Sequence, residues 1–291
     1  MENDYKFIKA YQADNAYRKS FNELAQSVFE LSFEDWYQNG YWTGKYIPYS
    51  FLHKDKVVAN VSVSPMKFMH NGKIRNYLQL GTVMTEEAYR NQGLIRRLME
   101  EVDSDFGKSV DGFFLFANET VLDFYPKFGY KRMTEHSFYK FPKNLTEMTA
   151  MKIPMKSKED YKLLEAAVIN SCPQSSIWML ENMELVMFYA TQFMSENVYE
   201  VKSQNAYVIA ELDDCNLFID QIFAPDKVNL DEIIASFGKE IKKVILGFTP
   251  LDTDSFLWEE STDEDTVLYG KGSSLIGLEG LKQRIPTLSH T

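Results

Sequence analysis

The stretch Val83-Met-Thr-Glu-Glu-Ala-Tyr-Arg-Asn-Gln-Gly-Leu-Ile-Arg-Arg-Leu-Met99 decides the fold of this chain. It predicts the end of a strand, a short polar loop that contains Arg90 and Gly93, and a helix over about 94–108 whose apolar residues repeat every four positions. The first N–H groups of a helix lack intrahelical partners and lie at the positive end of its dipole, so they can bind an anion. A glycine at the crossing lets phosphate oxygens approach the backbone without meeting a Cβ.

Three arginines favour a phosphate site at this loop. Arg90, Arg96 and Arg97 place positive charge there, in a chain whose net charge is −11. The same residues also fit a surface helix with a solvated arginine-rich face, so the segment alone leaves both interpretations open. Two other phosphate motifs are excluded. The dinucleotide fingerprint needs three glycines and only Gly93 is present, whereas Gly270-Lys-Gly-Ser273 lacks the first glycine and the magnesium-binding hydroxyl of a P-loop.

The residues around this segment predict alternating strands and helices, and therefore an α/β fold with helices packed against a mixed sheet. The expected elements of the first half are a strand at 5–9, helices at 15–30 and from Ser32, a loop broken by Gly40, Gly44 and Pro48, strands at 57–65 and 74–85 joined by a hairpin at Asn71-Gly72, a strand at 113–116 and a short helix at 120–127.

The second half repeats this order of elements without repeating the residues. The likeliest linker is 141–147, and we therefore expect two domains, at 1–143 and 149–291. The expected elements are a strand at 149–155, helices at 158–169 and 181–192, strands at 198–202, 206–212 and 216–223, a helix at 229–239, a strand at 243–247, and an extended tail after Gly270.

A second motif lies about thirty residues after the loop, in Asn118-Glu-Thr-Val-Leu-Asp-Phe-Tyr125-Pro-Lys-Phe-Gly129-Tyr130. The two motifs at this spacing resemble the GNAT superfamily of acetyl-CoA-dependent N-acetyltransferases. In that family the loop reads Arg/Gln-x-x-Gly-x-Gly/Ala, matched here by Arg90 and Gly93 and imperfectly by Ile95. The resemblance covers about residues 5–140. It implies a mixed, mostly antiparallel sheet flanked by helices, followed here by a second, degenerate GNAT-like domain.

The form Tyr-Arg-x-x-Gly-Leu-x-Arg-x-Leu-Met at 89–99 resembles a subgroup that tolerates a larger residue such as Ile95, the tandem-GNAT aminoglycoside acetyltransferases of the enhanced-intracellular-survival type. Those proteins also carry a sterol-carrier-like domain, for which no length remains in this sequence. In that subgroup the C-terminal carboxylate reaches the active site, and because the last domain is missing that role is not carried over to Thr291.

The resemblance implies a role for each matching position, with acetyl-CoA as cosubstrate and no metal. The backbone of Val83, Met84 and Thr85 would pair with the pantetheine arm like an added strand. Asn118 would contact the cofactor arm, and Tyr125 would be the general acid that protonates the departing thiolate. The pyrophosphate would be bound by the loop and the start of the helix, through Arg90, Asn91, Gln92, Gly93, Leu94, Ile95 and Arg96.

Alternatives remain at several of these positions. Without the resemblance, the residues favour Tyr125 as a core aromatic residue beside Phe124 and Phe128. The general base is not identified, because Glu86 and Glu87 fit only as exposed loop residues and a water relay would serve as well. The aromatic residues Tyr41, Trp42, Tyr46 and Tyr49 fit either a substrate wall with cation–π contacts or ordinary loop packing.

Composition narrows the class of protein. The 291 residues are 45% hydrophobic and 25% charged, which is typical of a globular chain. The excess of acidic residues argues against a general nucleic-acid binder. Because there is no apolar run of about 18 residues and no secretory signal, we expect a cytoplasmic protein without a membrane partner. The two cysteines and four histidines have neither disulfide nor metal spacing.

These observations predict an N-acetyltransferase that moves acetyl directly from acetyl-CoA to an amine, without a covalent enzyme intermediate. Net charge favours a cationic acceptor, either a small molecule or a lysine side chain. We expect cofactor binding in the first half alone, since the matching turn at 224–230 has no glycine and Pro225 removes an N–H. The alternatives are another acyl donor or acceptor, or an inactive CoA-binding regulatory or interaction protein. The oligomeric state stays open.

Overall fold

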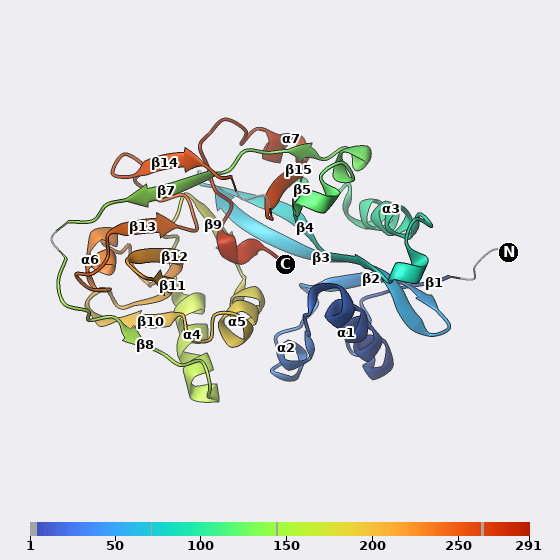
Figure 1. The fold of residues 1–291 in the computed structure, drawn as a ribbon, viewed down its shortest axis with the longest axis horizontal. Helices are drawn as coiled ribbons and strands as arrows, with labels where there is room; N and C mark the ends of the chain where they lie inside the picture. The colour runs from blue at the N-terminus through green and yellow to red at the C-terminus, as the bar shows by residue number, and fades with distance from the viewer. Residues whose placement is uncertain (1–4, 71, 144, 263–264) are drawn as a thin grey trace.

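The computed structural model describes residues 5–70, 72–143, 145–262 and 265–291 (Figure 1). The expected hairpin turn at Asn71 and part of the expected linker, at Asn144, lie outside these ranges. The described residues form two mixed sheets, one of eight strands and one of seven. The strands are β1 Lys6–Lys9, β2 Ile47–His53, β3 Lys56–His70, β4 Lys73–Thr85, β5 Gly112–Ala117, β6 Lys131–Arg132, β7 His136–Lys140, β8 Met151–Lys152, β9 Ile177–Leu180, β10 Val198–Val201, β11 Ala206–Asp213, β12 Asn216–Phe223, β13 Lys243–Leu246, β14 Leu257–Glu260 and β15 Val267–Lys271.

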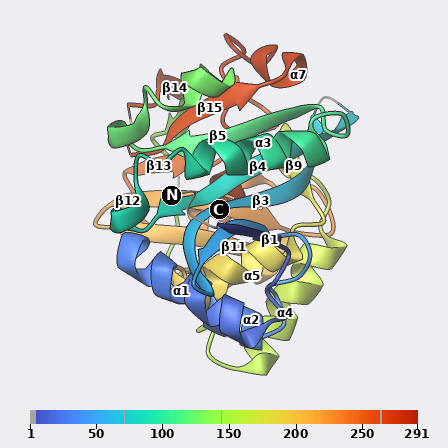
Figure 2. The same cartoon turned by 90° about the vertical axis from the view of Figure 1, so that its right-hand side faces the viewer.

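Helices cover both sheets. The α-helices are α1 Asn15–Phe29, α2 Glu34–Gln38, α3 Leu94–Phe106, α4 Lys158–Asn170, α5 Met183–Gln192, α6 Leu230–Ala235 and α7 Ser273–Ile276. Short 3₁₀ turns are η1 Glu87–Tyr89, η2 Glu119–Val121, η3 Tyr125–Phe128, η4 Lys202–Gln204 and η5 Thr287–Ser289. In the first sheet α3 lies on one face, and α1 and α2 lie on the other (Figure 2).

The first sheet has the order β1-β2-β3-β4-β5-β15-β6, with β9 added against β3. Neighbouring strands are antiparallel except β4 and β5, which are parallel and joined through α3. The expected strand, loop and helix around Gly93 are confirmed. The expected loop through Pro48 is wrong, because β2 begins at Ile47 and includes it. Proline is tolerated near a strand start, and the Pro48 carbonyl accepts a hydrogen bond from the amide of Ala10 (3.0 Å).

The second sheet has the order β14-β7-β13-β12-β11-β10-β8 and repeats this plan. Its parallel pair is β12 and β13, joined through α6. The expected elements at 158–169, 181–192, 198–202, 206–212 and 216–223 are present with small shifts of their ends. The protein therefore contains two GNAT-like α/β units, the second without a glycine loop.

The two sheets exchange strands. β15, from the end of the chain, pairs with β5 and β6 in the first sheet, while β7, from the first half, pairs with β13 and β14 in the second. The sheets are thus not divided at 143–149, where the sequence suggested a linker. The physical reason is that β5 and β13 each need a partner along one edge, and sequence order does not say which distant strand supplies it. The domain bounds 1–143 and 149–291 stay a prediction about the chain.

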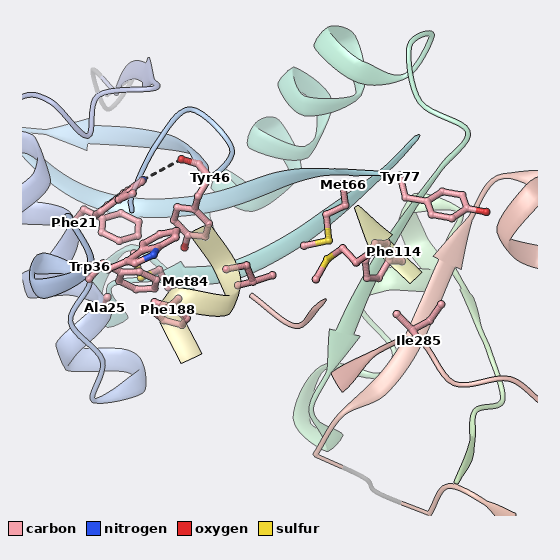
Figure 3. Packing of buried hydrophobic residues seen from close by; sticks show 14 of the residues in the cluster. Phe21, Ala25, Trp36, Tyr46, Met66, Tyr77, Met84, Phe114, Phe188 and Ile285 are labelled. Atoms are coloured by element: carbon pink, nitrogen blue, oxygen red, sulfur yellow. Dashed lines mark hydrogen bonds between the residues drawn. The ribbon is translucent and has the colours of Figure 1, made fainter. Parts of the chain in front are cut away.

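The end of the chain is packed rather than extended, so the expectation for the tail is wrong. It forms β15, α7 and η5, and Ile285, Leu288 and Ser289 are buried. Figure 3 shows Ile285 beside Phe114 of β5, in the same core cluster that brings Phe188 of α5 against Trp36. The last residues lie between the two sheets (Figure 1).

Candidate active site

The first feature of the site is the divergence of β4 and β5. Their parallel pairing runs from Tyr77 with Gly112 to Leu80 with Leu115 and stops there, although β4 continues to Thr85. In the described register, the edge of Val83–Thr85 that faces β5 has no strand partner. This open edge fits an added, strand-like amide chain, which is the expected place for a pantetheine arm.

The second feature is the start of α3. Gly93 is in the left-handed region (φ 76°), and a Cβ built there would meet nothing within 4 Å. Asn91 is also left-handed (φ 61°). Among the described residues no side chain caps α3, so the amides of its first turn remain available to an anion. A phosphate group therefore has both space and donors at this loop.

The flanking side chains leave the loop open. Arg90 lies over the end of β4, with its Nε 3.4 Å from the carbonyl of Thr85. The Arg96 guanidinium lies 5.1 Å from the centre of the Phe128 ring, and that of Arg97 lies 4.3 Å from the Phe51 ring. Ile95 packs against the core beneath α3. Its side chain is thus directed to the core rather than standing over the loop amides.

Asn118 and Tyr125 follow β5 in the chain, in the segment that leads to β6. The Asn118 side chain caps η2 by accepting from the amide and hydroxyl of Thr120, and it is exposed. The Tyr125 ring lies 6.0 Å from that of Tyr269 and 6.2 Å from that of Tyr130. Burial raises the pKa of the Tyr125 phenol to about 12, so it keeps its proton at neutral pH and can act as a proton donor. Tyr269 comes from β15, which the sequence did not predict as part of this site.

A cavity of about 40 Å³ lies between β3, β9 and the helices α2 and α5. Its lining combines apolar and polar side chains: Trp36, Lys45, Tyr46, Ser64, Pro65, Met66, Met179, Leu180, Glu181, Asn182, Glu184, Leu185 and Thr291. Asn182 is buried, and its Nδ2 has no hydrogen-bond partner within the described parts of the chain. Glu184 and Glu181 at this cavity are paired with Lys45 (3.1 Å) and Lys67 (2.9 Å).

Thr291 reaches the site although its role was not carried over from the resemblance. The Thr291 hydroxyl donates to the amide oxygen of Gln79 at 2.6 Å. A Cβ added at Gly81 would collide with the Thr291 carbonyl oxygen. Next to it, the His290 ring stacks on Phe116 of β5. The glycine at 81 is the one sequence signal for this contact, and its meaning depends on the tertiary packing.

The four aromatic candidates have different positions. Trp42 and Tyr46 are buried in the core under α1 and α2, and of the four only Tyr46 lines the cavity. Tyr49 lies on the opposite face, where its hydroxyl donates to Asp105 (2.5 Å). Tyr41 donates to Glu165 of α4 (2.6 Å). The interpretation as ordinary packing therefore fits Trp42 and Tyr49.

The acidic side chains Glu34, Glu86 and Glu87 are also separated. Glu34 is bonded to Arg18 (3.0 Å), which lowers the pKa of the Glu34 carboxyl. Glu86 and Glu87 line a wide groove of about 710 Å³ between α1 and the β4–α3 loop, together with Lys56 and Arg90. These carboxylates are thus not gathered at one acceptor site.

The matching loop of the second sheet is closed by its own side chains. Asn229 caps α6 by accepting from the amides of Asp231 and Glu232, which place negative charge at the helix start. Gln174 fills the turn before it and bonds the carbonyl of Asp226 (2.7 Å). An anion would meet a filled cap and two carboxylates there.

No group of three or more His, Cys, Asp or Glu side chains could hold a metal ion in the parts of the chain with described positions. In those same parts, no helix is long and apolar enough to span a membrane.

The fold, the divergence of β4 and β5 and the uncapped α3 define a two-unit protein of GNAT architecture. Residues 10–133 match the family model described as an acetyltransferase (GNAT) domain. This part of the chain is thus similar to the acetyltransferase domains of the GNAT family.

Solved structures support this fold over most of the chain. A conserved protein from Enterococcus faecalis V583, described as a probable N-acyltransferase, has a TM-score of 0.63 and 14% identity over 94% of this chain and 74% of that one. A GCN5-related N-acetyltransferase from Kribbella flavida has a TM-score of 0.58 and 15% identity, over 91% of this chain and 71% of that one. Eis1 from Mycobacterium abscessus has a TM-score of 0.55 and 13% identity, over 91% of this chain and 72% of that one. No curated protein matches the chain.

Proposed function

We propose that this protein transfers an acetyl group directly from acetyl-CoA to the amine of a slender, cationic acceptor. Three observations carry the proposal: the uncapped start of α3, the unpaired edge at Val83–Thr85, and a small cavity lined by Thr291, whose carbonyl oxygen lies against Gly81 of β4. They accommodate a phosphate, an amide chain and an amine in that order.

The residues of the chain have separate tasks in this proposal. Acetyl-CoA supplies an activated thioester when bound. The loop from Arg90 to Arg96 binds its pyrophosphate, and Val83–Thr85 orient its arm, with Asn118 at the neighbouring strand end. Tyr125 gives its proton to the departing sulfur, because a phenol with a raised pKa remains protonated until the thiolate forms. Exclusion of water by Tyr130 and Tyr269 keeps this donor in a dry environment.

The cavity supports a narrow acceptor. The cavity is small, at about 40 Å³, so the acceptor enters it by its amine end. Apolar walls at Trp36 and Met66 fit an aliphatic stem, and the unpartnered amide of Asn182 fits an oxygen close to the amine. Local carboxylates are paired with lysines, so attraction of a cation rests on the net charge of −11.

The test is a thiol-release assay with acetyl-CoA and a panel of amines in increasing salt. We expect turnover with slender primary amines, a kcat/KM that rises with pH as the amine loses its proton, and a kcat/KM that falls as salt screens the charge. Selectivity for an anionic acceptor, or no salt effect, would contradict the cationic part of the proposal. CoA binding without turnover on any amine would favour the alternative, an inactive CoA-binding regulatory or interaction protein.

A further inference from the structure

The strand β4 contains a bulge at the point where β5 leaves it. Ser62 pairs with Gly81 and Asn60 pairs with Met84, so two residues of β4 oppose the single residue Val61 of β3. Thr82, in this bulge, has a left-handed backbone (φ 46°). Such a conformation is unfavourable for a β-branched residue and persists only where surrounding contacts impose it. Bulges next to active sites commonly redirect a backbone group.

A buried hydrogen-bond chain ends at this bulge. The Tyr11 hydroxyl lies 2.6 Å from Ser50 Oγ, which donates to Asn60 Oδ1 at 2.8 Å. Asn60 Nδ2 donates to the Thr82 carbonyl (2.8 Å) and to Ser62 Oγ (2.9 Å). Asn60, Ser50 and Ser62 are each 0% exposed. Because the Thr82 carbonyl can only accept, the amide of Asn60 has one possible orientation.

The second contact on the bulge comes from the acceptor cavity. The Tyr46 hydroxyl lies 2.5 Å from Thr82 Oγ1, and the Tyr46 ring lines that cavity. Burial raises the pKa of the Tyr46 phenol, so it remains a neutral hydrogen-bonding group. The side chain and the carbonyl of Thr82 are therefore both fixed, from two different strands or loops.

The hydrogen bond from Asn60 to the Thr82 carbonyl also fixes the direction of the Val83 N–H, because the peptide bond between them is planar. In a trans peptide the carbonyl of one residue and the N–H of the next point in opposite directions, and the described residues contain no cis peptide bond. Because Asn60 holds the Thr82 carbonyl, the N–H of Val83 points away from Asn60. Neither Thr82 nor Val83 has a partner on β3 in the described register.

We propose that Asn60 is a positioning residue that fixes the β4 bulge and so aims the Val83 N–H at the thioester carbonyl of the acyl donor. This inference rests on the proposed function and names a residue that the loop and tyrosine motifs do not include. The Val83 N–H stabilises the negative charge that develops on the carbonyl oxygen during attack. Asn60 itself touches neither substrate.

The first experiment compares Asn60→Ala with the wild type in steady-state assays and CoA calorimetry. Removing one oxyanion donor costs about 10²–10³-fold in kcat, and here the donor is misdirected rather than removed. We expect kcat to fall by roughly 10–100-fold while the CoA dissociation constant stays within about threefold. A folded variant with wild-type kcat, or equal losses in kcat and CoA affinity, would overturn the positioning role.

Ser236→Ala is the matched control for loss of a buried hydrogen bond. Ser236 is buried in the second unit, and its hydroxyl donates to the carbonyl of Ile233 at 2.7 Å. We expect this variant to lower the melting temperature and leave kcat unchanged. A fall of kcat in both variants would show that stability alone explains the effect.

A spectroscopic readout separates this inference from the proposed function. In ¹⁵N-valine-labelled protein, acetonyl-CoA, which keeps a carbonyl but cannot transfer it, should shift the Val83 amide resonance downfield more than CoA does. Asn60→Ala should abolish that difference. Failure of the proposed function would appear separately, as wild-type protein without CoA binding or thiol release. Even then, Asn60→Ala must move the Val83 resonance of the free protein, and an unchanged resonance would refute the role of Asn60.

Discussion

At the scale of single residues, Tyr125 is buried just after β5, against the rings of Tyr130 and Tyr269. Its pKa, raised to about 12 by burial, means that the phenol is fully protonated through the neutral and mildly alkaline range. A donor of this kind is useful only when strong negative charge develops beside it, as on a departing thiolate. Its chemistry therefore fits the general acid expected from the motif.

Tyr125→Phe removes the proton and keeps the ring. We expect kcat to fall by roughly 10²–10⁴-fold with CoA affinity nearly unchanged, as measured by thiol release and calorimetry. In the wild type, loss of this proton should not reduce the rate below about pH 11. Wild-type turnover in the Phe variant would exclude Tyr125 from the mechanism.

Asp220 of β12 is a buried carboxyl of the second unit. Burial raises its pKa to about 7, opposed by Arg284 and reinforced by Glu211. The folded state therefore holds the proton more tightly than the unfolded state, whose value is near 3.8. As pH rises from about 4 to 7, the free energy of unfolding should fall through this group.

Asp220→Asn should remove that fall. Urea unfolding of both proteins between pH 4 and 8 should give a difference in stability that grows in favour of the variant up to about pH 7 and then stays constant. Parallel pH profiles for the two proteins would show that Asp220 does not titrate in this range.

At the scale of elements, α3 and α6 occupy the same place in the two units but differ at their first turns. The start of α3 has a left-handed glycine and no capping side chain, whereas α6 begins with a capping asparagine followed by two acidic residues. We expect calorimetry to give one CoA per chain. Two bound CoA molecules would contradict the contrast between these helices.

Gly93→Val should weaken CoA binding, because a side chain would stand where the phosphates lie and the left-handed backbone would be strained. We expect a loss of at least about tenfold in affinity. Gly40→Val is the matched control, since Gly40 has a similar φ (84°) and equally open space. Equal losses of CoA affinity in both variants would attribute the effect to backbone strain alone.

At the scale of the whole molecule, the exchange of β7 and β15 joins the two units. Each sheet takes a strand from the other half of the chain, and the segment that follows β15 continues to Thr291 beside Gly81. The site therefore depends on residues from both ends of the sequence. Neither half contains all the strands of one sheet.

Leu268→Ala in β15 tests this coupling. Leu268 is buried in the core of the first sheet (3% exposed), so its truncation should cost about 2–5 kcal/mol. We expect one cooperative transition for the wild type and the variant, with coincident changes in tryptophan fluorescence and far-UV circular dichroism. Two separate transitions, with only one of them shifted in the variant, would show that the units unfold independently.

The sequence determined the local parts of this protein. The four-residue apolar repeat after Gly93 identified α3, and the strand–loop–helix around it is present as expected. Hydrophobic periodicity also predicted most elements of the second half. A helix or strand that buries one face shows this in the spacing of apolar residues that are close in sequence. The positions of Gly93 and Tyr125 were found in the same way, through motifs of fixed spacing.

Only the tertiary structure decided the strand exchange, the place of Thr291 and the contacts of Tyr46 and Asn60 with Thr82. Pairing of β15 with β5, or contact of Thr291 with Gly81, joins residues that are about 150 to 210 positions apart. No local pattern encodes such a pairing, because the free edge of a strand accepts any backbone of suitable geometry. Likewise, Asn60 lies in an apolar strand pattern, and only the fold brings its amide within hydrogen-bond distance of the Thr82 carbonyl.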